Sequence, residues 1–224
     1  KNSWACYAAK AISETDSSVN FAAFDTDSNG KLSVGELQVI FLIAGGESAT
    51  GLNTPGGVWA MAGSLLCDAN EDGSYTMNES GEHGVTLDNV RLLGVNSSYW
   101  GQNGYSQFGE KHGYSADISW DATIGVMAHE LGHAYFDLPD LYDTTNTTSG
   151  IGAFGIMGGG AWGYKDLTER TGSTPVHLSA WSKEKLGVCN PQTISSGSGN
   201  YTLPAVYQTI DNTSSCGIYK ASTS

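Results

Sequence analysis

The sequence predicts an α/β (α+β) fold in which a twisted mixed sheet carries one prominent amphipathic helix. At 224 residues the chain is long enough for one domain with a full hydrophobic core. A β-rich apolar run at 37–46 ends in two glycines, which indicates a buried strand. Apolar residues recur at helical spacing over 121–136, which indicates the clearest helix of the chain.

Weaker patterns predict the elements around this core. Apolar residues recur at helical spacing within 3–13, which favours a short amphipathic helix. The helix over 121–136 has Asp121 and Ser119 as candidates for its N-cap. Further short strands are expected at 85–95 and 105–110.

The last part of the sequence predicts one more helix and a β tail. The helix is expected within 173–187, because Pro175 suits a first helical turn and Gly187 suits a C-terminal cap. Residues 193–210 have the pattern of a β-hairpin.

The composition excludes some classes of partner. The formal net charge is −13, so nucleic acid and anionic lipid surfaces would be repelled. No run approaches the roughly 20 apolar residues of a membrane span. Thirty glycines alongside six Trp and eleven Tyr indicate many tight turns around a compact core, and do not indicate disorder.

The four cysteines favour an exported protein. They show no CxxC spacing, so a zinc or redox motif made of cysteine is not expected. Two disulfides are expected, with four buried free thiols as the alternative. The favoured pairs are Cys6 with Cys67 and Cys189 with Cys216, and Lys1 is then a processed N-terminus.

The stretch "HELGH" at 129–133 carries the clearest chemistry. On a helix, His129 and His133 project from one face and can bind one zinc ion at about 2.0–2.1 Å, with Glu130 beside them. Zinc lowers the pKa of water to about 7, and a neighbouring carboxylate can pass the proton to a leaving amine. The motif therefore predicts zinc-assisted peptide hydrolysis with Glu130 as general base and acid.

Two other stretches follow the spacing of twelve-residue calcium loops. The loop at 25–36 would use side chains together with the backbone C=O at its seventh position, and it continues into a strand. We therefore expect calcium held for structure, and not a paired calcium sensor. The predicted ligands of this first loop are Asp25, Asp27, Asn29, Lys31 and Glu36. Those of the second loop, at 68–79, are Asp68, Asn70, Asp72, Ser74 and Glu79.

The chain resembles the immune inhibitor A family of secreted bacterial metallopeptidases, which are metzincin-like zincins. The resemblance rests on four ordered motifs: "ATIGVMAHELGH", "LPDLYD", "GIGAFGIMGGGAWG" and "HLSAWSKEKLG". It implies a zincin-like catalytic domain over 1–190, in which residues 1–133 form the upper half and residues 134–190 form the lower half. A tail over 191–224 would begin further β structure.

The resemblance also implies how the protein works and where. It implies a secreted, extracellular and calcium-stabilised zinc endopeptidase that is made as a zymogen. Met157 would be the Met-turn residue, which forms an apolar floor beneath the zinc-binding histidines. Family members have further segments on both sides of the matching region, so other fragments of its own precursor are expected partners, beside protein and peptide substrates.

The third zinc ligand is open, because this chain departs from the family pattern. The position of the usual ligand is occupied by Pro139, as though one residue had been inserted before "LPD". Asp140 keeps that context, and Pro139 can turn the chain back toward the histidines. Asp140 is therefore the expected ligand. The competing carboxylates are Asp137, which is also expected to tolerate the positive φ of a helix exit, Asp143 and Glu169.

Two polar residues are candidate donors to the oxyanion, namely His177 and Tyr164. Glu110 and His112 are candidates for lining the substrate strand or binding a cation. Two other functions stay open beside the endopeptidase. One is a calcium-loaded adhesion module with a vestigial zinc site, and the other is a zinc amidase.

Overall fold

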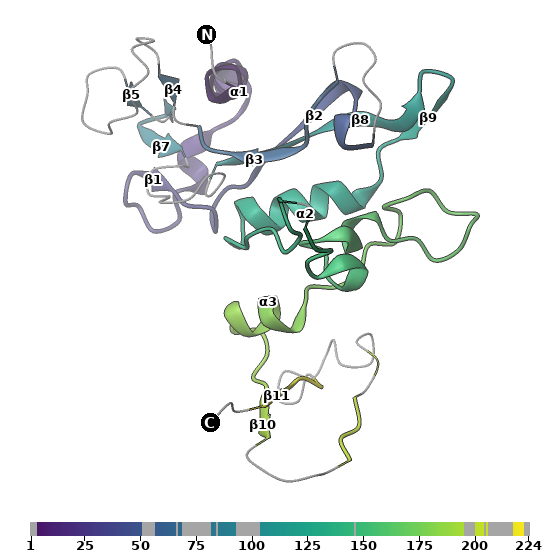
Figure 1. Cartoon of the computed structure of the whole chain (residues 1–224). Coiled ribbons are helices and arrows are strands. Elements are labelled where there is room, and N and C mark those ends of the chain that lie inside the picture. Colours follow the sequence, from purple (N-terminus) through teal and green to yellow (C-terminus); the bar gives the residue numbers. More distant parts are fainter. Residues whose placement is uncertain are drawn as a thin grey trace. The chain divides into compact units, whose positions relative to one another are not determined.

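The computed structural model describes residues 4–50, 57–65, 67–68, 82–83, 85–92, 104–145, 147–194, 200–203, 205 and 217–221. The chain divides into two compact units, Lys1–Pro139 and Asp140–Ser224, and each is described by itself (Figure 1). The expected division of a catalytic domain into upper and lower halves stays a prediction.

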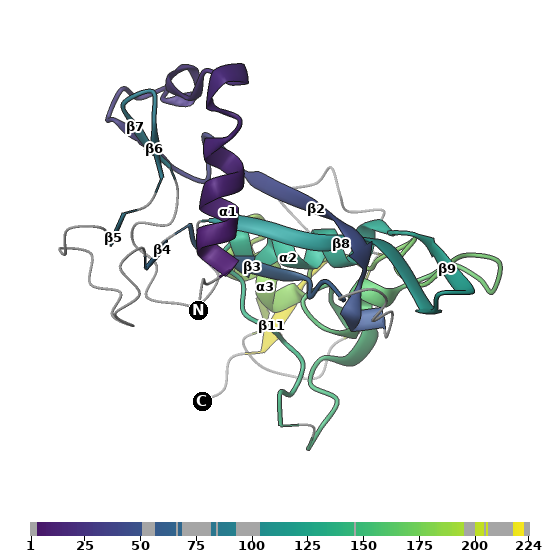
Figure 2. The same ribbon diagram turned by 90° about the horizontal axis from the view of Figure 1, so that it is seen from above.

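The first unit is built on a four-stranded mixed sheet. Strand β8 (Tyr105–Ser115) lies between β2 (Val39–Gly46) and β3 (Met61–Gly63), and β9 (Ile118–Asp121) also pairs with β8 (Figure 2). Strand β2 is parallel to β8, whereas β3 and β9 are antiparallel to it. The apolar run at 37–46 thus forms a strand of a mixed sheet, as predicted. The expected burial is wrong, because within the described residues β2 lies at an edge of the sheet and its side chains Ile40 and Leu42 are exposed.

Two helices lie on opposite sides of this sheet (Figure 1): α1 (Trp4–Ser13) and α2 (Ile124–Ala134). Helix α2 contacts β8 and β3. On the other side, apolar residues of α1 join a buried core with a ring from β8. Its members are Ala8, Ile12, Phe21, Leu32, Leu65, Val90, Leu92 and Tyr105. Burial raises the pKa of the Tyr105 phenol to about 12.

A smaller sheet supports the first predicted calcium loop. Its strands are β1 (Lys31–Leu32), β7 (Val90–Leu92) and β6 (Thr86–Leu87) in that order, with β1 parallel to β7. Asp88 and Asn89 both adopt positive φ in the turn between β6 and β7. An Asp88 carboxylate oxygen also accepts the backbone N–H of Phe21 at 2.8 Å, which joins the turn to the core.

Short elements complete the first unit. Strands β4 (Cys67–Asp68) and β5 (Glu82–His83) pair with each other. Three 3₁₀ helices connect the main elements. They are η1 (Asp16–Ser18), η2 (Phe21–Phe24) and η3 (Ser48–Thr50).

The second unit contains η4 (Gly152–Phe154), η5 (Gly159–Trp162) and the short helix α3 (Ala180–Lys185). The predicted helix at 173–187 is therefore too long at its start. The backbone N–H groups of Thr174 and Val176 donate to the carbonyls of Gly163 and Gly160, so this segment is bound to the glycine-rich loop at 149–163 and does not form a helix. Ser179 caps α3 instead, because its hydroxyl accepts the N–H of Ser182 at 3.1 Å.

The described part of the tail differs from the predicted hairpin. Strands β10 (Gln192–Ile194) and β11 (Tyr219–Ala221) pair in parallel, whereas a hairpin pairs antiparallel strands. Most of 193–210 lies outside the described residues, so the hairpin itself stays a prediction.

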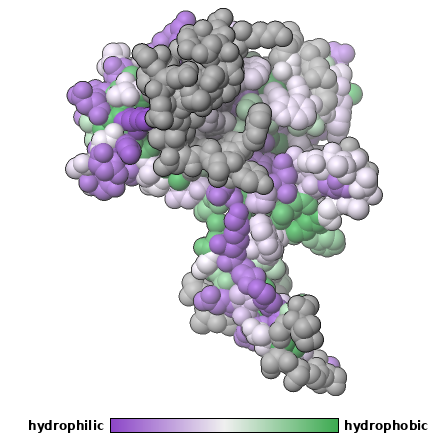
Figure 3. Space-filling view, turned by 60° about the vertical axis from the view of Figure 1, so that its left-hand side comes forward, coloured by the Kyte–Doolittle hydropathy of each residue, from purple (hydrophilic) through white to green (hydrophobic). Residues whose placement is uncertain are grey.

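Hydrophobic residues reach the surface in several groups among hydrophilic ones (Figure 3). In the described part of the chain, no helix has the length and apolarity of a membrane span. Cys6 and Cys189 are each disulfide-bonded, and which cysteines they join stays a prediction.

Candidate metal centre

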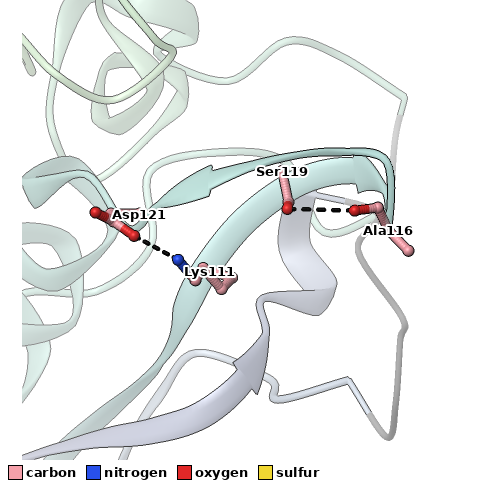
Figure 4. A network of polar contacts seen from close by, with 4 residues as sticks. All are labelled: Lys111, Ala116, Ser119 and Asp121. Carbon is pink, nitrogen blue, oxygen red and sulfur yellow. Dashed lines mark hydrogen bonds and ion pairs between the residues drawn. The ribbon is translucent and has the colours of Figure 1, made fainter.

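Helix α2 begins directly after the β8–β9 hairpin, which holds its first turn. Lys111 of β8 and Asp121 of β9 form an ion pair at 2.6 Å (Figure 4). Two residues later Thr123 is the N-cap, in place of the predicted Asp121 or Ser119, which lie within β9. The Thr123 hydroxyl lies 3.3 Å from Nδ1 of the buried His112. The strand layer therefore fixes where the helix starts.

The two histidines of α2 converge on one point. Nε2 of His129 lies 3.1 Å from Nε2 of His133. Two nitrogens bound to one tetrahedral zinc at about 2.0–2.1 Å would be about 3.3 Å apart, so the observed spacing suits a shared ion. A hydrogen bond between the imidazoles is the alternative interpretation of the same distance.

The end of α2 orients the second histidine. The backbone N–H of Asp137 donates to the carbonyl of His133, and Asp137 has a φ of 54°. This confirms the expected positive φ at the helix exit. The chain then returns so that Nδ1 of His133 lies 2.6 Å from the carbonyl of Leu138. A carbonyl can only accept, so Nδ1 carries the proton and Nε2 keeps its lone pair for a metal.

One carboxylate joins the histidines. The candidate ligand atoms of His129, His133 and Asp140 all lie within 4.8 Å of one another. Glu130 directly follows His129 on α2 and is 7% exposed. Two nitrogens and one carboxylate are a donor set that zinc accepts in hydrolytic sites.

The competing carboxylates are engaged elsewhere. Asp143 accepts hydrogen bonds from the backbone and hydroxyl groups of Thr145 and Thr147, and hydrogen bonds from these groups lower its pKa. Glu169 accepts the N–H of Lys165 and the hydroxyl of Thr174, both at 2.7 Å. Asp143 and Glu169 therefore each accept hydrogen bonds within their own local turn.

The second unit contains the predicted Met-turn and oxyanion residues. Met157 is 1% exposed, and its carbonyl accepts the N–H of Leu141 at 2.7 Å. A Cβ on Gly160 would come within 2.2 Å of the Val176 side chain, so the loop needs glycine there. The carbonyl of His177 accepts the N–H of Ile156. Tyr164 is 51% exposed. The roles of Met157, His177 and Tyr164 stay predictions.

The first calcium loop gathers its carboxylates. Ligand atoms of Asp25, Asp27 and Glu36 lie within 4.8 Å of one another. Hydrogen bonds from the backbone and hydroxyl of Ser33, with others from Thr26, lower the pKa of Glu36 to about 2. The backbone N–H of Asn29 donates to a carboxylate oxygen of Asp25 at 3.0 Å. The carboxylates are therefore prearranged around one point.

The second calcium loop lies almost wholly outside the described residues. Asp68 belongs to β4. The other predicted ligands fall outside the described ranges, so this loop stays a prediction.

Sequence reasoning missed one polar residue in the first unit. Glu47 is fully buried and follows β2 directly. Its only signal in the sequence is a glutamate after an apolar run that ends in two glycines.

A pocket of about 390 Å³ also went unpredicted. It lies between the sheet and the first turn of α2. Its apolar lining includes Leu42, Phe108, Ile124 and Met127. Met127 and His129 are two positions apart on the helix, about 200° of rotation, so the pocket borders a different face of α2 from the histidines.

Comparison with known proteins bears on the same region. Residues 111–189 match the family model described as immune inhibitor A peptidase M6, catalytic domain. This stretch runs from β8 to the end of α3 and contains all four motifs of the resemblance. No curated protein and no solved structure matched the chain.

Proposed function

We propose that the chain is a zinc endopeptidase that hydrolyses proteins, because residues 111–189 match the family model described as immune inhibitor A peptidase M6, catalytic domain. The observation that supports this most directly is the convergence of His129, His133 and Asp140 within 4.8 Å. The tautomer of His133, set by the Leu138 carbonyl at 2.6 Å, leaves the lone pair for a metal on Nε2.

Each residue of the cluster has a distinct role in this proposal. His129, His133 and Asp140 hold the ion. When bound, zinc supplies a Lewis acid that makes water acidic enough to lose a proton near neutral pH. Glu130 takes that proton and returns it to the leaving amine. His177 and Tyr164 are the proposed donors to the oxyanion, and Met157 is the proposed apolar floor.

The substrate is proposed to bind as an extended strand. Within the described residues, β3 lies at one edge of the sheet and contacts α2, the helix with the two histidines. An edge strand offers unpaired N–H and C=O groups to a peptide, which would then run beside α2.

The test removes the proton acceptor and keeps the metal ligands. Glu130→Gln should lower casein hydrolysis by at least ~10²-fold with zinc still bound, because an amide of the same size cannot accept the proton. Glu14→Gln, an exposed position on the opposite side of the sheet from α2, is the matched control. A zinc-replete Glu130→Gln protein that hydrolyses casein at the wild-type rate would refute the assignment.

We also propose calcium as a structural ion in the loop at 25–36, held by Asp25, Asp27 and Glu36 with Asn29 and the carbonyl of Lys31. The prearranged carboxylates support this. The family match favours the peptidase over the adhesion module. Secretion, activation from a zymogen and the choice of an endopeptidase over an amidase rest on the family resemblance.

Another fragment of the same precursor is the proposed partner of β2. Within the described residues this strand lies at the other edge of the sheet, with Ile40 and Leu42 41% and 61% exposed. An apolar edge strand of this kind is usually covered by another strand. Mass spectrometry of the native protein should show a second polypeptide that denaturation releases, and a lone native chain would count against this partner.

A further inference from the structure

Glu47 is a buried carboxylate that the proposed chemistry does not use. It is 0% exposed, and a glutamate is almost never fully buried unless its oxygens are satisfied. It lies one residue beyond β2, at the point where the chain leaves the sheet.

Three backbone N–H groups satisfy the Glu47 carboxylate. Oε1 accepts the N–H of Ala49 and the N–H of Ala60, both at 3.0 Å. Oε2 accepts the N–H of Gly109 at 2.9 Å. A carboxylate only accepts, so it suits three converging donors in a way that a neutral amide cannot.

These donors come from three different segments. Ala49 belongs to η3, Gly109 belongs to β8, and Ala60 directly precedes β3. The backbone around Glu47 is tied to the same segments, because its N–H donates to the carbonyl of Lys111 at 2.7 Å. One side chain thus joins the end of β2, the middle of β8 and the start of β3.

The packing at this junction leaves little room for adjustment. A Cβ on Gly109 would come within 2.8 Å of the Glu47 nitrogen. Strand β3 itself is only three residues long. Besides its pairing with β8, the segment before it is held by Gln107, whose Nε2 donates to the carbonyl of Trp59 at 3.0 Å. The Glu47 carboxylate is therefore a principal anchor of the start of this edge strand.

We propose that Glu47 is a positioning residue, which holds the edge strand β3 in the place where an extended peptide substrate pairs with it. This inference rests on the proposed peptidase function. Glu47 touches neither the substrate nor the metal cluster. It acts through Ala60 and Gly109, so its loss should weaken the binding of long substrates and leave the hydrolytic step intact.

The test compares substrates of different length. Glu47→Gln and Glu47→Asp are assayed with a peptide of about eight residues, long enough at ~3.3 Å per residue to run along β3, and with a short blocked substrate that cannot reach it. KM for the long peptide should rise roughly tenfold with kcat retained, as expected for a lost charge-assisted hydrogen bond. Both parameters for the short substrate should stay within about twofold of wild type.

The matched control is Asp88→Asn, which also removes a carboxylate that accepts a backbone N–H, but on the α1 side of the sheet. It should leave the ratio between the two substrates unchanged. An equal change for both substrates in the Glu47 variants, or no change for either, would overturn the proposal.

A second measurement is independent of activity. In the Glu130→Gln background, Glu47→Asp should speed amide hydrogen exchange at Ala60 and Gly109 by about tenfold, with α2 unchanged. Unaltered exchange at Ala60 would also overturn the proposal. If the wild-type protein cleaves neither substrate, the proposed function fails instead, while the exchange experiment still tests whether Glu47 anchors β3.

Discussion

Asp137 and Asp140 lie three residues apart after the C-terminal end of α2, but their structural positions differ. Asp137 occupies the left-handed turn with a φ of 54°, which an aspartate tolerates better than most side chains. The turn leads through Leu138, whose carbonyl orients His133, to Asp140. Asp140 is the carboxylate found with the histidines.

Loss of the third ligand should therefore separate these residues. Asp140→Ala should release zinc on dialysis and abolish peptidase activity, because two imidazoles alone hold the ion weakly. Asp137→Ala and Glu169→Ala should keep the metal. Zinc content per chain, measured after dialysis by atomic absorption, decides this without an activity assay. Stoichiometric zinc in Asp140→Ala would show that another group is the ligand.

At the scale of elements, the loop at 25–36 depends on how its last carboxylate is held. Glu36 has a pKa of about 2, below the ordinary value of 4.5, because Ser33 and Thr26 donate to its charged form. A carboxyl group whose pKa is lower in the folded state than in the unfolded state stabilises the folded protein at any pH above its unfolded pKa. This stabilisation is lost as the pH falls toward the folded pKa.

The lowered pKa of Glu36 predicts how the stability of the loop depends on pH. Without calcium, Glu36→Gln should melt at a lower temperature than wild type at pH 6, and the gap should close between about pH 4.5 and pH 2. Calcium should raise the melting temperature of wild type and not of Glu36→Gln, because it binds the folded loop. Glu14→Gln should match wild type throughout. A gap that stays constant down to pH 2 would exclude the lowered pKa.

The elements that could be predicted from sequence are those with strong local signals. The helix at 3–13 and the helix around His129 have apolar residues at helical spacing, and the strand at 37–46 is a β-rich apolar run. Each appears within a few residues of its expected bounds. The start of α3 could not be predicted, because Val176 bonds to Gly160 in a loop that is distant in the sequence.

The candidate site divides in the same way. His129, Glu130 and His133 follow from spacing on one helix, whereas the place of Asp140 depends on a turn whose shape only the structure shows. Glu47 carries no local signal, since its three donors lie 2, 13 and 62 residues away. The residues that neighbour Glu47 in the sequence therefore do not reveal that these three donors meet at its carboxylate.

At the scale of the whole chain, the two compact units raise the question of how the cysteines pair. Cys6 lies on α1 of the first unit, and Cys189 follows α3 in the second. The predicted pairs, Cys6 with Cys67 and Cys189 with Cys216, would each close a loop within one unit. Each unit would then be stabilised by its own disulfide, without a disulfide between the units.

The stability that the protein would lose on reduction of the two predicted disulfides follows from the lengths of the loops that they close. The paired cysteines are 61 and 27 residues apart, and loop-closure entropy puts their contributions at about 4 and about 3.5 kcal/mol. Reduction of the Glu130→Gln protein, which cannot digest itself, should therefore lower its melting temperature by roughly 15–30 °C. Replacing Cys189 and Cys216 together by serine should reproduce only a fraction of that fall, because the first unit keeps its own disulfide. Non-reducing peptide mapping should yield the two predicted pairs, whereas a peptide that joins Cys6 to Cys189 would show that a disulfide links the two units.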